Sequence, residues 1–191
     1  YALAKIVRKI AAPFPPRHTK PTFRWLQILS SSFMAFSHGS NDGQKFIGVF
    51  ALALFLGGTI ETFYIPKWVV LVAALAMGLG TSFGGWRIIQ TMGLKMVKIE
   101  TYQGFCAETA AATTISLASF ITFPIPGNDL RGIPLSTTHT IGTSIVGATI
   151  AKRLSLLRLG IAKNIVLAWL LTFPISGILA FVITLLIKSV S

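Results

Sequence analysis

Two stretches of the chain are apolar for long enough to cross a lipid bilayer as single helices. They cover residues 67–90 and 162–187. A hydrocarbon core about 30 Å thick demands roughly twenty consecutive apolar residues of a helix, and each stretch meets that demand. Pro174 and Gly177 lie inside the second stretch and predict a kink in it. The pattern therefore predicts two transmembrane helices.

Two further apolar stretches contain polar interruptions. Residues 24–58 hold the sequence HGSNDGQK in their middle, and residues 102–152 hold Pro-rich and polar segments between 123 and 139. Inside a membrane, backbone that leaves a regular helix is tolerated only where protein or a water-filled cavity surrounds it. We expect 24–58 to be a broken helix that unwinds and restarts at 36–45. We expect 102–152 to be a helical hairpin with its tip near 124–134.

The composition agrees with a membrane protein. Of the 191 residues, 53% are hydrophobic and 12% are charged, and the mean hydropathy is +0.73. These values exclude a soluble domain, a disordered chain and a coiled coil. The 17 Lys and Arg residues outnumber the 5 Asp and Glu residues, but they lie between apolar runs, so no nucleic acid is expected as a partner. The single cysteine, Cys106, excludes a disulfide scaffold.

The positions of the basic residues predict the orientation in the membrane. Most of them lie in 1–24, 87–98 and 152–163, which the positive-inside rule places in the cytoplasm. The hairpin must then enter and leave the membrane on the same side. We therefore expect 1–23 to be a basic cytoplasmic segment that begins with an interfacial helix, and 24–191 to be an all-α, polytopic membrane domain. Because the chain begins at Tyr1 and not at Met, we expect it to be a piece of a longer protein.

The first interruption combines residues that suit both an anion and a cation. A helix that restarts near Asn41 exposes backbone N–H groups and the positive end of its dipole, which favour an anion. The carboxylate of Asp42 suits a small hard cation. Lys45 either pairs with Asp42, helps to hold an anion, or lines a wet cavity.

The second interruption ends in a helix start. Pro134 stops the preceding element, and Ser136, Thr137 and Thr138 then occupy the cap and first turn of a helix. Their hydroxyl and N–H groups either bind a ligand together or only cap the helix. Two half-helix N-termini that point at one place are typical of secondary transporters of anions.

Glu108 and the histidines leave alternatives open. Glu108 lies in an apolar stretch and is either a cation or proton site or a structural hydrogen-bond partner. His139 and Ser136 lack a third orienting group, which argues against a hydrolase, so we expect no enzyme. The spacing of His38, Asp42 and His139 does not indicate a metal site.

Five segments carry a resemblance to a known family. Residues 36–45 (FSHGSNDGQK) resemble the Gly-x-Asn-Asp signature of the PiT family of inorganic phosphate transporters, in its bacterial form. The remaining segments follow in the order of the family: 87–93, 104–108, 134–139 and 169–177. The resemblance runs from about residue 24 to residue 188 and corresponds to the C-terminal of two inverted repeats. Residues 125–132 look like an insertion at a hairpin tip that is usually short in the family.

The resemblance implies a transporter in which each repeat contributes a broken helix and a hairpin to one phosphate site, with sodium or proton coupling and no other cofactor. Carried over by position, five residues contact phosphate or its coupling cation, and Asp42 is among them. Glu108 matches a family glutamate implicated in transport, and with Asp42 it is a sodium ligand if the coupling ion is sodium. The five are Asn41, Asp42, Ser136, Thr137 and Thr138.

The expected partners are inorganic phosphate, the coupling cation, the lipid bilayer, the missing N-terminal repeat and a second copy in a homodimer. The expected location is the inner membrane of a bacterial or archaeal cell. The alternatives are a permease for sulfate or another oxyanion, and a channel-like or structural membrane subunit.

Overall fold

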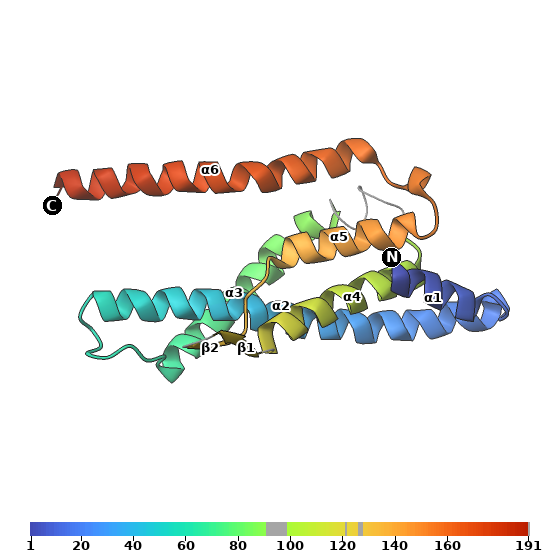
Figure 1. Ribbon diagram of the computed structural model, residues 1–191, viewed down its shortest axis with the longest axis horizontal. Coiled ribbons are helices and arrows are strands. Elements are labelled where there is room, and N and C mark those ends of the chain that lie inside the picture. The colour runs from blue at the N-terminus through green and yellow to red at the C-terminus, as the bar shows by residue number, and fades with distance from the viewer. Residues whose placement is uncertain (91–98, 121, 126–127, 191) are drawn as a thin grey trace.

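The computed structural model describes residues 1–90, 99–120, 122–125 and 128–190, and these residues are mostly helical (Figure 1). Successive long helices run back and forth along one direction. The elements in chain order are α1 (Ala2–Ala11), α2 (Pro16–Leu56), α3 (Lys67–Ile88), α4 (Thr101–Phe120), β1 (Thr122–Ile125), β2 (Asn128–Arg131), α5 (Thr137–Ile150), the short 3₁₀ helix η2 (Leu154–Leu156) and α6 (Leu159–Val190).

Helix α1 lies at the start of the chain, where the sequence analysis expected an interfacial helix. Its buried residue Ala4 packs in an apolar cluster with Cys106, Ala107 and Ala148 of the α4–α5 hairpin. Arg8 Nη1 donates a hydrogen bond to the carbonyl oxygen of Ala151 at 3.3 Å. The basic N-terminal segment is therefore held against the end of the hairpin where 152–163 begins.

Helix α2 is continuous through residues 36–45, so the predicted break at that place is wrong. Gly39 and Gly43 each lower helix propensity by about 1 kcal/mol relative to Ala, but tertiary contacts outweigh this. Ser37 Oγ lies 2.9 Å from Ser116 Oγ of α4, and Asn41 is fully buried against the segment that precedes α5. The polar side chains reach their partners from a regular helix, so its backbone has no need to unwind.

Helix α2 also begins earlier than expected, at Pro16, where proline suits the first turn because it has no N–H to satisfy. Its 41 residues span about 60 Å at 1.5 Å per residue, twice the thickness of a hydrocarbon core. The predicted boundary at 23/24 therefore falls inside one helix, whose first part carries Arg17, Lys20 and Arg24.

The predicted hairpin of two helices is confirmed. Helices α4 and α5 lie antiparallel: at one end Gln103 Nε2 donates to the carbonyl oxygen of Ala148 at 3.2 Å. At the other end the N–H of Ile133 donates to the carbonyl oxygen of Ala118 at 2.8 Å. Small buried side chains such as Ala111 let the helices approach closely, as is typical of helix packing in membranes.

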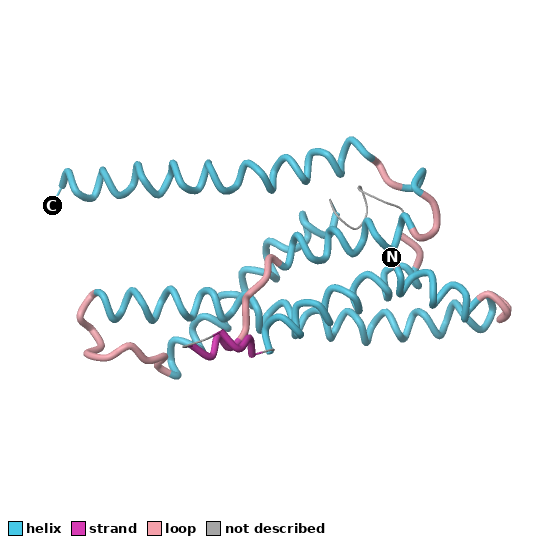
Figure 2. The backbone as a smooth tube through the Cα atoms, in the orientation of Figure 1, coloured by secondary structure: helices cyan, strands magenta, loops and turns pink. Residues whose placement is uncertain are grey.

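The tip of the hairpin differs from an all-α fold. Strands β1 and β2 pair antiparallel, with Thr122 opposite Arg131 and Ile125 opposite Asn128 (Figure 2). The predicted insertion 125–132 therefore contains one strand of a small β-hairpin, and its residues 126 and 127 lie outside the described part. Gly132 follows with a φ of +70°, and a Cβ there would lie 2.3 Å from the carbonyl oxygen of Ser119. Only glycine fits where this chain returns past the end of α4.

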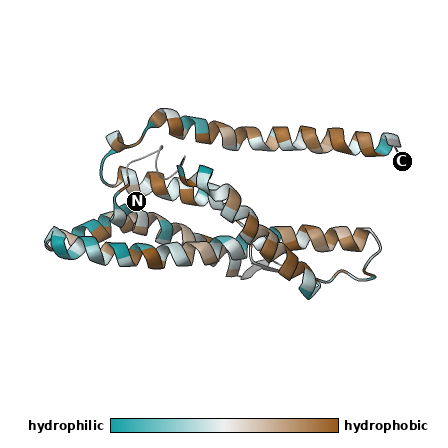
Figure 3. Cartoon of the chain, turned by 180° about the vertical axis from the view of Figure 1, so that it is seen from behind, coloured by the Kyte–Doolittle hydropathy of each residue, from teal (hydrophilic) through white to brown (hydrophobic). Residues whose placement is uncertain are grey.

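Helices α3 and α6 match the two predicted transmembrane stretches. Both are long and apolar enough to cross a membrane by length and composition, and their side chains are almost all exposed. The hydrophobic colouring of α6 covers nearly its whole length (Figure 3). Helix α6 runs through Pro174 without interruption. Exposed apolar surface of this extent requires an apolar surrounding, which a lipid bilayer or neighbouring helices supply.

Candidate functional site

Asn41 joins the middle of α2 to the extended segment before α5. Its Nδ2 donates to the carbonyl oxygen of Leu135 at 2.7 Å, and its Oδ1 accepts from the N–H of Leu135 at 2.8 Å. Ser119 Oγ of α4 donates to the same Oδ1 at 3.4 Å. Asn41 is fully buried, and its carboxamide pairs with both backbone groups of Leu135, as a neighbouring β-strand would.

Asp42 is the centre of a polar cluster that it forms with Asn41, Lys45 and Thr137. Its Oδ1 accepts from Asn41 Nδ2 at 3.0 Å and from Lys45 Nζ at 2.8 Å. Its Oδ2 accepts from Thr137 Oγ1 of α5 at 3.1 Å. His38 Nδ1 lies 3.2 Å from Oδ2 without hydrogen-bond geometry. The side chain of Asp42 is 18% exposed, so this carboxylate lies in a partly desolvated place and links α2 to α5.

Of the three roles that the sequence left open for Lys45, the structure shows the ion pair with Asp42. The same Nζ donates to the carbonyl oxygen of Leu135 at 2.6 Å. The ammonium group therefore lies between a carboxylate on α2 and a backbone carbonyl just before α5. Lys45 is 38% exposed at its side chain.

The three hydroxyl residues at the start of α5 have three different environments. Ser136 is the N-cap: its Oγ accepts from the N–H of His139 at 3.4 Å and forms a short hydrogen bond with His139 Nδ1. Thr137 is buried and donates to Asp42, whereas Thr138 is exposed. The His139 ring contacts the ring of Trp169 on α6, with 4.2 Å between centroids. The first turn of α5 thus offers the Thr138 hydroxyl and free backbone N–H groups to a ligand.

Glu108 lies at a second place, away from Asp42. Its Oε2 accepts from Ser30 Oγ at 2.7 Å and from Ser31 Oγ at 2.9 Å, both on α2. Asp42 lies eleven positions after Ser31, which corresponds to about 16 Å along the helix. The structure therefore does not bring Asp42 and Glu108 into one cation site. Among the described residues, no three His, Cys, Asp or Glu side chains gather as metal ligands.

A pocket of about 440 Å³ borders Glu108. Gln27 of α2 and Gly104 of α4 lie in its wall, and a Cβ at Gly104 would come within 2.5 Å of the Gln27 side chain. The close approach of α4 to α2 at this glycine leaves the carboxylate of Glu108 facing a cavity and two serines.

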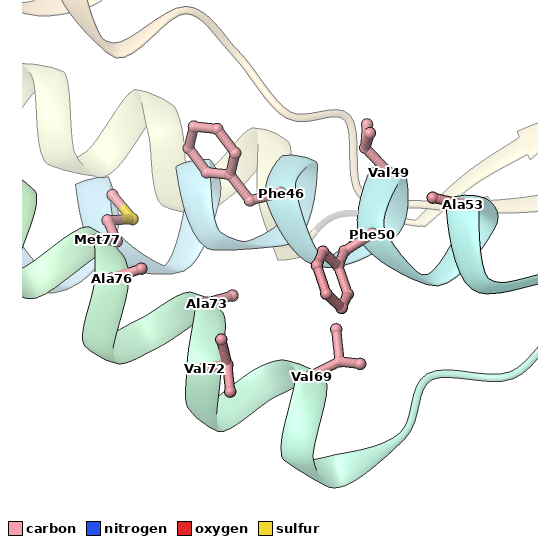
Figure 4. A pocket seen from close by; sticks show the side chains of 9 residues that line it. All are labelled: Phe46, Val49, Phe50, Ala53, Val69, Val72, Ala73, Ala76 and Met77. Atoms are coloured by element: carbon pink, nitrogen blue, oxygen red, sulfur yellow. The ribbon is translucent and has the colours of Figure 1, made fainter.

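A separate pocket of about 470 Å³ between α2 and α3 carries no polar chemistry (Figure 4). It begins one residue after Lys45 on α2, and every side chain that lines it is apolar. Such a wall suits a lipid chain or another helix and offers nothing to an ion. The lining residues are Phe46, Val49, Phe50, Ala53, Val69, Val72, Ala73, Ala76 and Met77.

Several of these contacts were not predicted from the sequence. The carbonyl oxygen of Leu135 accepts from both Asn41 and Lys45, but a backbone group leaves no signal in the residue types. Ser30 and Ser31 had a signal: with Ser32 they form a run of hydroxyl residues between apolar residues of α2. Thr91, Met92, Gly93 and Lys95, which belong to the loop predicted to be cytoplasmic, lie outside the described residues.

Comparison with known proteins decides the family. The model of the PHO4 phosphate transporter family matches residues 4–180, which is nearly the whole chain. The chain belongs to this phosphate transporter family. As a member, it is an integral protein of the cell membrane and not an enzyme.

Individual proteins similar to this chain are also described as phosphate transporters or permeases. The chain is 46% identical over 160 residues to a probable low-affinity inorganic phosphate transporter of Rhizobium meliloti, covering 83% of this chain and 45% of that protein. A protein of the same description from Bacillus subtilis is 37% identical over 180 residues, covering 94% and 51%. A putative phosphate permease of Pyrococcus furiosus is 28% identical over 181 residues, covering 92% and 41%. The chain thus spans about half the length of these relatives. No solved structure matches it.

Proposed function

We propose that this chain is the second half of a secondary active transporter that carries inorganic phosphate across the cell membrane together with a cation, sodium or proton. One observation carries the proposal: in a chain of the PHO4 family, Asp42 and Lys45 on α2 meet Thr137 at the N-terminus of α5. The relatives are about twice as long, which supports a further half of similar size in the complete transporter.

The anion binds at the first turn of α5. Backbone N–H groups and the positive end of the helix dipole face outward there, beside the exposed Thr138 hydroxyl. Lys45 offsets the negative charge of Asp42, which would otherwise repel phosphate. Helix α2 contributes no N-terminus, because it is continuous, and takes part through the side chains of Asp42 and Lys45.

The basic segments support the orientation with the N-terminal segment in the cytoplasm. Arg8 of α1 contacts Ala151, and Lys152 pairs with Glu100 just before α4. The start of the chain, the start of α4 and the end of α5 thus lie at one end of the molecule (Figure 1). One end with most of the basic residues is what the positive-inside rule requires of the cytoplasmic side.

Access to the site alternates when the α4–α5 hairpin moves against α2. The hydrogen bonds that join them at the site are the Asn41–Leu135 pair, the Ser119–Asn41 bond, the Lys45–Leu135 bond and the Thr137–Asp42 bond. Binding of the anion and the cation changes the charges at these contacts. The substrates can therefore shift the equilibrium between the two positions of the hairpin by their different affinities for each.

Thr138→Ala is expected to weaken the apparent affinity for phosphate about tenfold, because a hydrogen bond to a charged ligand is worth roughly 1.5–3 kcal/mol and 1.4 kcal/mol is a factor of ten. Thr138→Ser keeps the hydroxyl and should retain most of the affinity. The measurement is the KM of radiolabelled phosphate uptake by the complete transporter in proteoliposomes.

Thr143→Ala is the matched control, since Thr143 lies farther along α5 and its hydroxyl bonds to backbone carbonyls of the same helix. Its KM should stay at the wild-type value. If Thr138→Ala also keeps that KM and only melts at a lower temperature, Thr138 merely supports the helix start and does not bind phosphate.

A further inference from the structure

The ammonium group of Lys45 occupies a position whose oxygen atoms suit a small cation. Asp42 Oδ1 lies 2.8 Å from Nζ and the carbonyl oxygen of Leu135 lies 2.6 Å from it. A carboxylate oxygen together with a backbone carbonyl oxygen is a ligand set that hard cations take in proteins. Discontinuous segments in transporters use such carbonyls to bind coupling ions.

The surrounding residues hold these two oxygens in place whether or not Lys45 is there. Asn41, which is fully buried, bonds to both the N–H and the carbonyl oxygen of Leu135. Asn41 Nδ2 and Thr137 Oγ1 each donate to the carboxylate of Asp42. The ligand set is therefore built into α2 and the segment before α5, and the lysine only reaches into it.

The charges nearby leave little attraction for a second cation. Among the described residues, Asp42 is the one carboxylate that contacts Lys45, through its Oδ1. His38 lies beside the other carboxylate oxygen of Asp42, Oδ2. Ser119 of α4 and Thr137 of α5 contribute neutral groups, and the N-terminus of α5 adds the positive end of its dipole. The residues of α3 in the cavity beside His38 are uncharged: Val70, Ala74, Met77, Gly78 and Thr81.

From this geometry we propose that Lys45 is a resident cation, whose ammonium group fills the position between Asp42 and Leu135 and keeps sodium out of it. Any coupling sodium ion of this half then binds at other oxygens. The inference rests on the proposed function only in that the oxygens belong to the transport site. It assigns to Asp42 a fixed cationic partner where the family resemblance implied an exchangeable one.

Removal of the lysine is expected to create a sodium site. The purified complete transporter should bind one more ²²Na⁺ ion per copy as Lys45→Ala than as wild type, and NaCl but not choline chloride should raise the melting temperature of the variant more than that of the wild type. Lys45→Arg keeps a cation in place and should bind as many sodium ions as the wild type. Lys20→Ala, which removes an exposed lysine from the same helix, should do so too.

The inference is overturned if Lys45→Ala folds and binds no more sodium than the wild type. Lys45→Met keeps most of the side-chain stem and serves the same test if Lys45→Ala does not fold. The sodium count does not depend on which substrate is carried. If Lys45→Ala binds an extra sodium ion but the wild-type transporter carries no phosphate, the resident cation is supported and the proposed function is contradicted. Phosphate uptake without the extra ion does the reverse.

Discussion

Asp42→Asn should abolish phosphate uptake by the complete transporter while leaving the protein folded. The Asp42 carboxylate accepts hydrogen bonds from Lys45 of α2 and from Thr137 of α5. It therefore connects the ammonium group of Lys45 to the first turn of α5. Asparagine has nearly the same shape but no charge, and it leaves the ammonium group of Lys45 without its counter-ion. Hydrogen bonds to a charged group are worth roughly 1.5–3 kcal/mol each, so loss of both costs at least about 3 kcal/mol, which predicts a fall in uptake of roughly a hundredfold or more.

The measurement is the initial rate of radiolabelled phosphate uptake in proteoliposomes under an imposed cation gradient, with the melting temperature taken in parallel. Glu61→Gln is the control for loss of a carboxylate, because Glu61 is exposed in the connection between α2 and α3. It should transport like the wild type. Near-normal uptake by Asp42→Asn, with unchanged dependence on the cation, would remove Asp42 from the transport site.

Glu108→Gln should lose concentrative uptake far more than it loses phosphate binding. Glutamine keeps an oxygen that can accept from Ser30 and Ser31, so the contacts between α4 and α2 can persist. Only the negative charge that faces the neighbouring cavity disappears. A carboxylate in a membrane-embedded helix costs free energy and is therefore by default functional. A coupled cation is the species that needs its negative charge.

Two measurements separate these roles: phosphate binding to the purified transporter, and accumulation of phosphate against its gradient in proteoliposomes. Glu61→Gln is again the control, since Glu61 is exposed in the connection between α2 and α3. It should leave both quantities unchanged. If binding and accumulation fall together in Glu108→Gln, or if neither falls, Glu108 acts as a structural hydrogen-bond partner.

Apolar run length and Pro and Gly punctuation predicted much of the fold. The stretches 67–90 and 162–187 became α3 and α6, and 102–152 became the α4–α5 hairpin. These predictions succeed because length and polarity alone decide whether a segment can form a long helix in an apolar environment. The strands β1 and β2 were missed, because a pair of four-residue strands with prolines beside the turn has no clear alternating pattern.

The predicted break in α2 failed for a physical reason that concerns its side chains. Polar residues inside an apolar helix indicate either a broken backbone or polar partners on neighbouring helices, and the sequence does not distinguish the two. Asn41 and Asp42 have such partners on the segment before α5 and on its first turn. Which carbonyl receives Lys45 was equally out of reach, since Leu135 offers only its backbone.

If the residues at the start of α5 bind phosphate, the transporter should distinguish oxyanions by their shape and protonation. Phosphate keeps a proton at neutral pH that it can donate to an acceptor such as the Asp42 carboxylate, whereas sulfate has none, and arsenate shares the shape and protonation of phosphate. The most direct measurement is the inhibition of radiolabelled phosphate uptake in proteoliposomes by arsenate and by sulfate. We expect arsenate to compete at phosphate-like concentrations and sulfate to have little effect. Inhibition by sulfate at those concentrations, with arsenate inert, would contradict phosphate as the substrate.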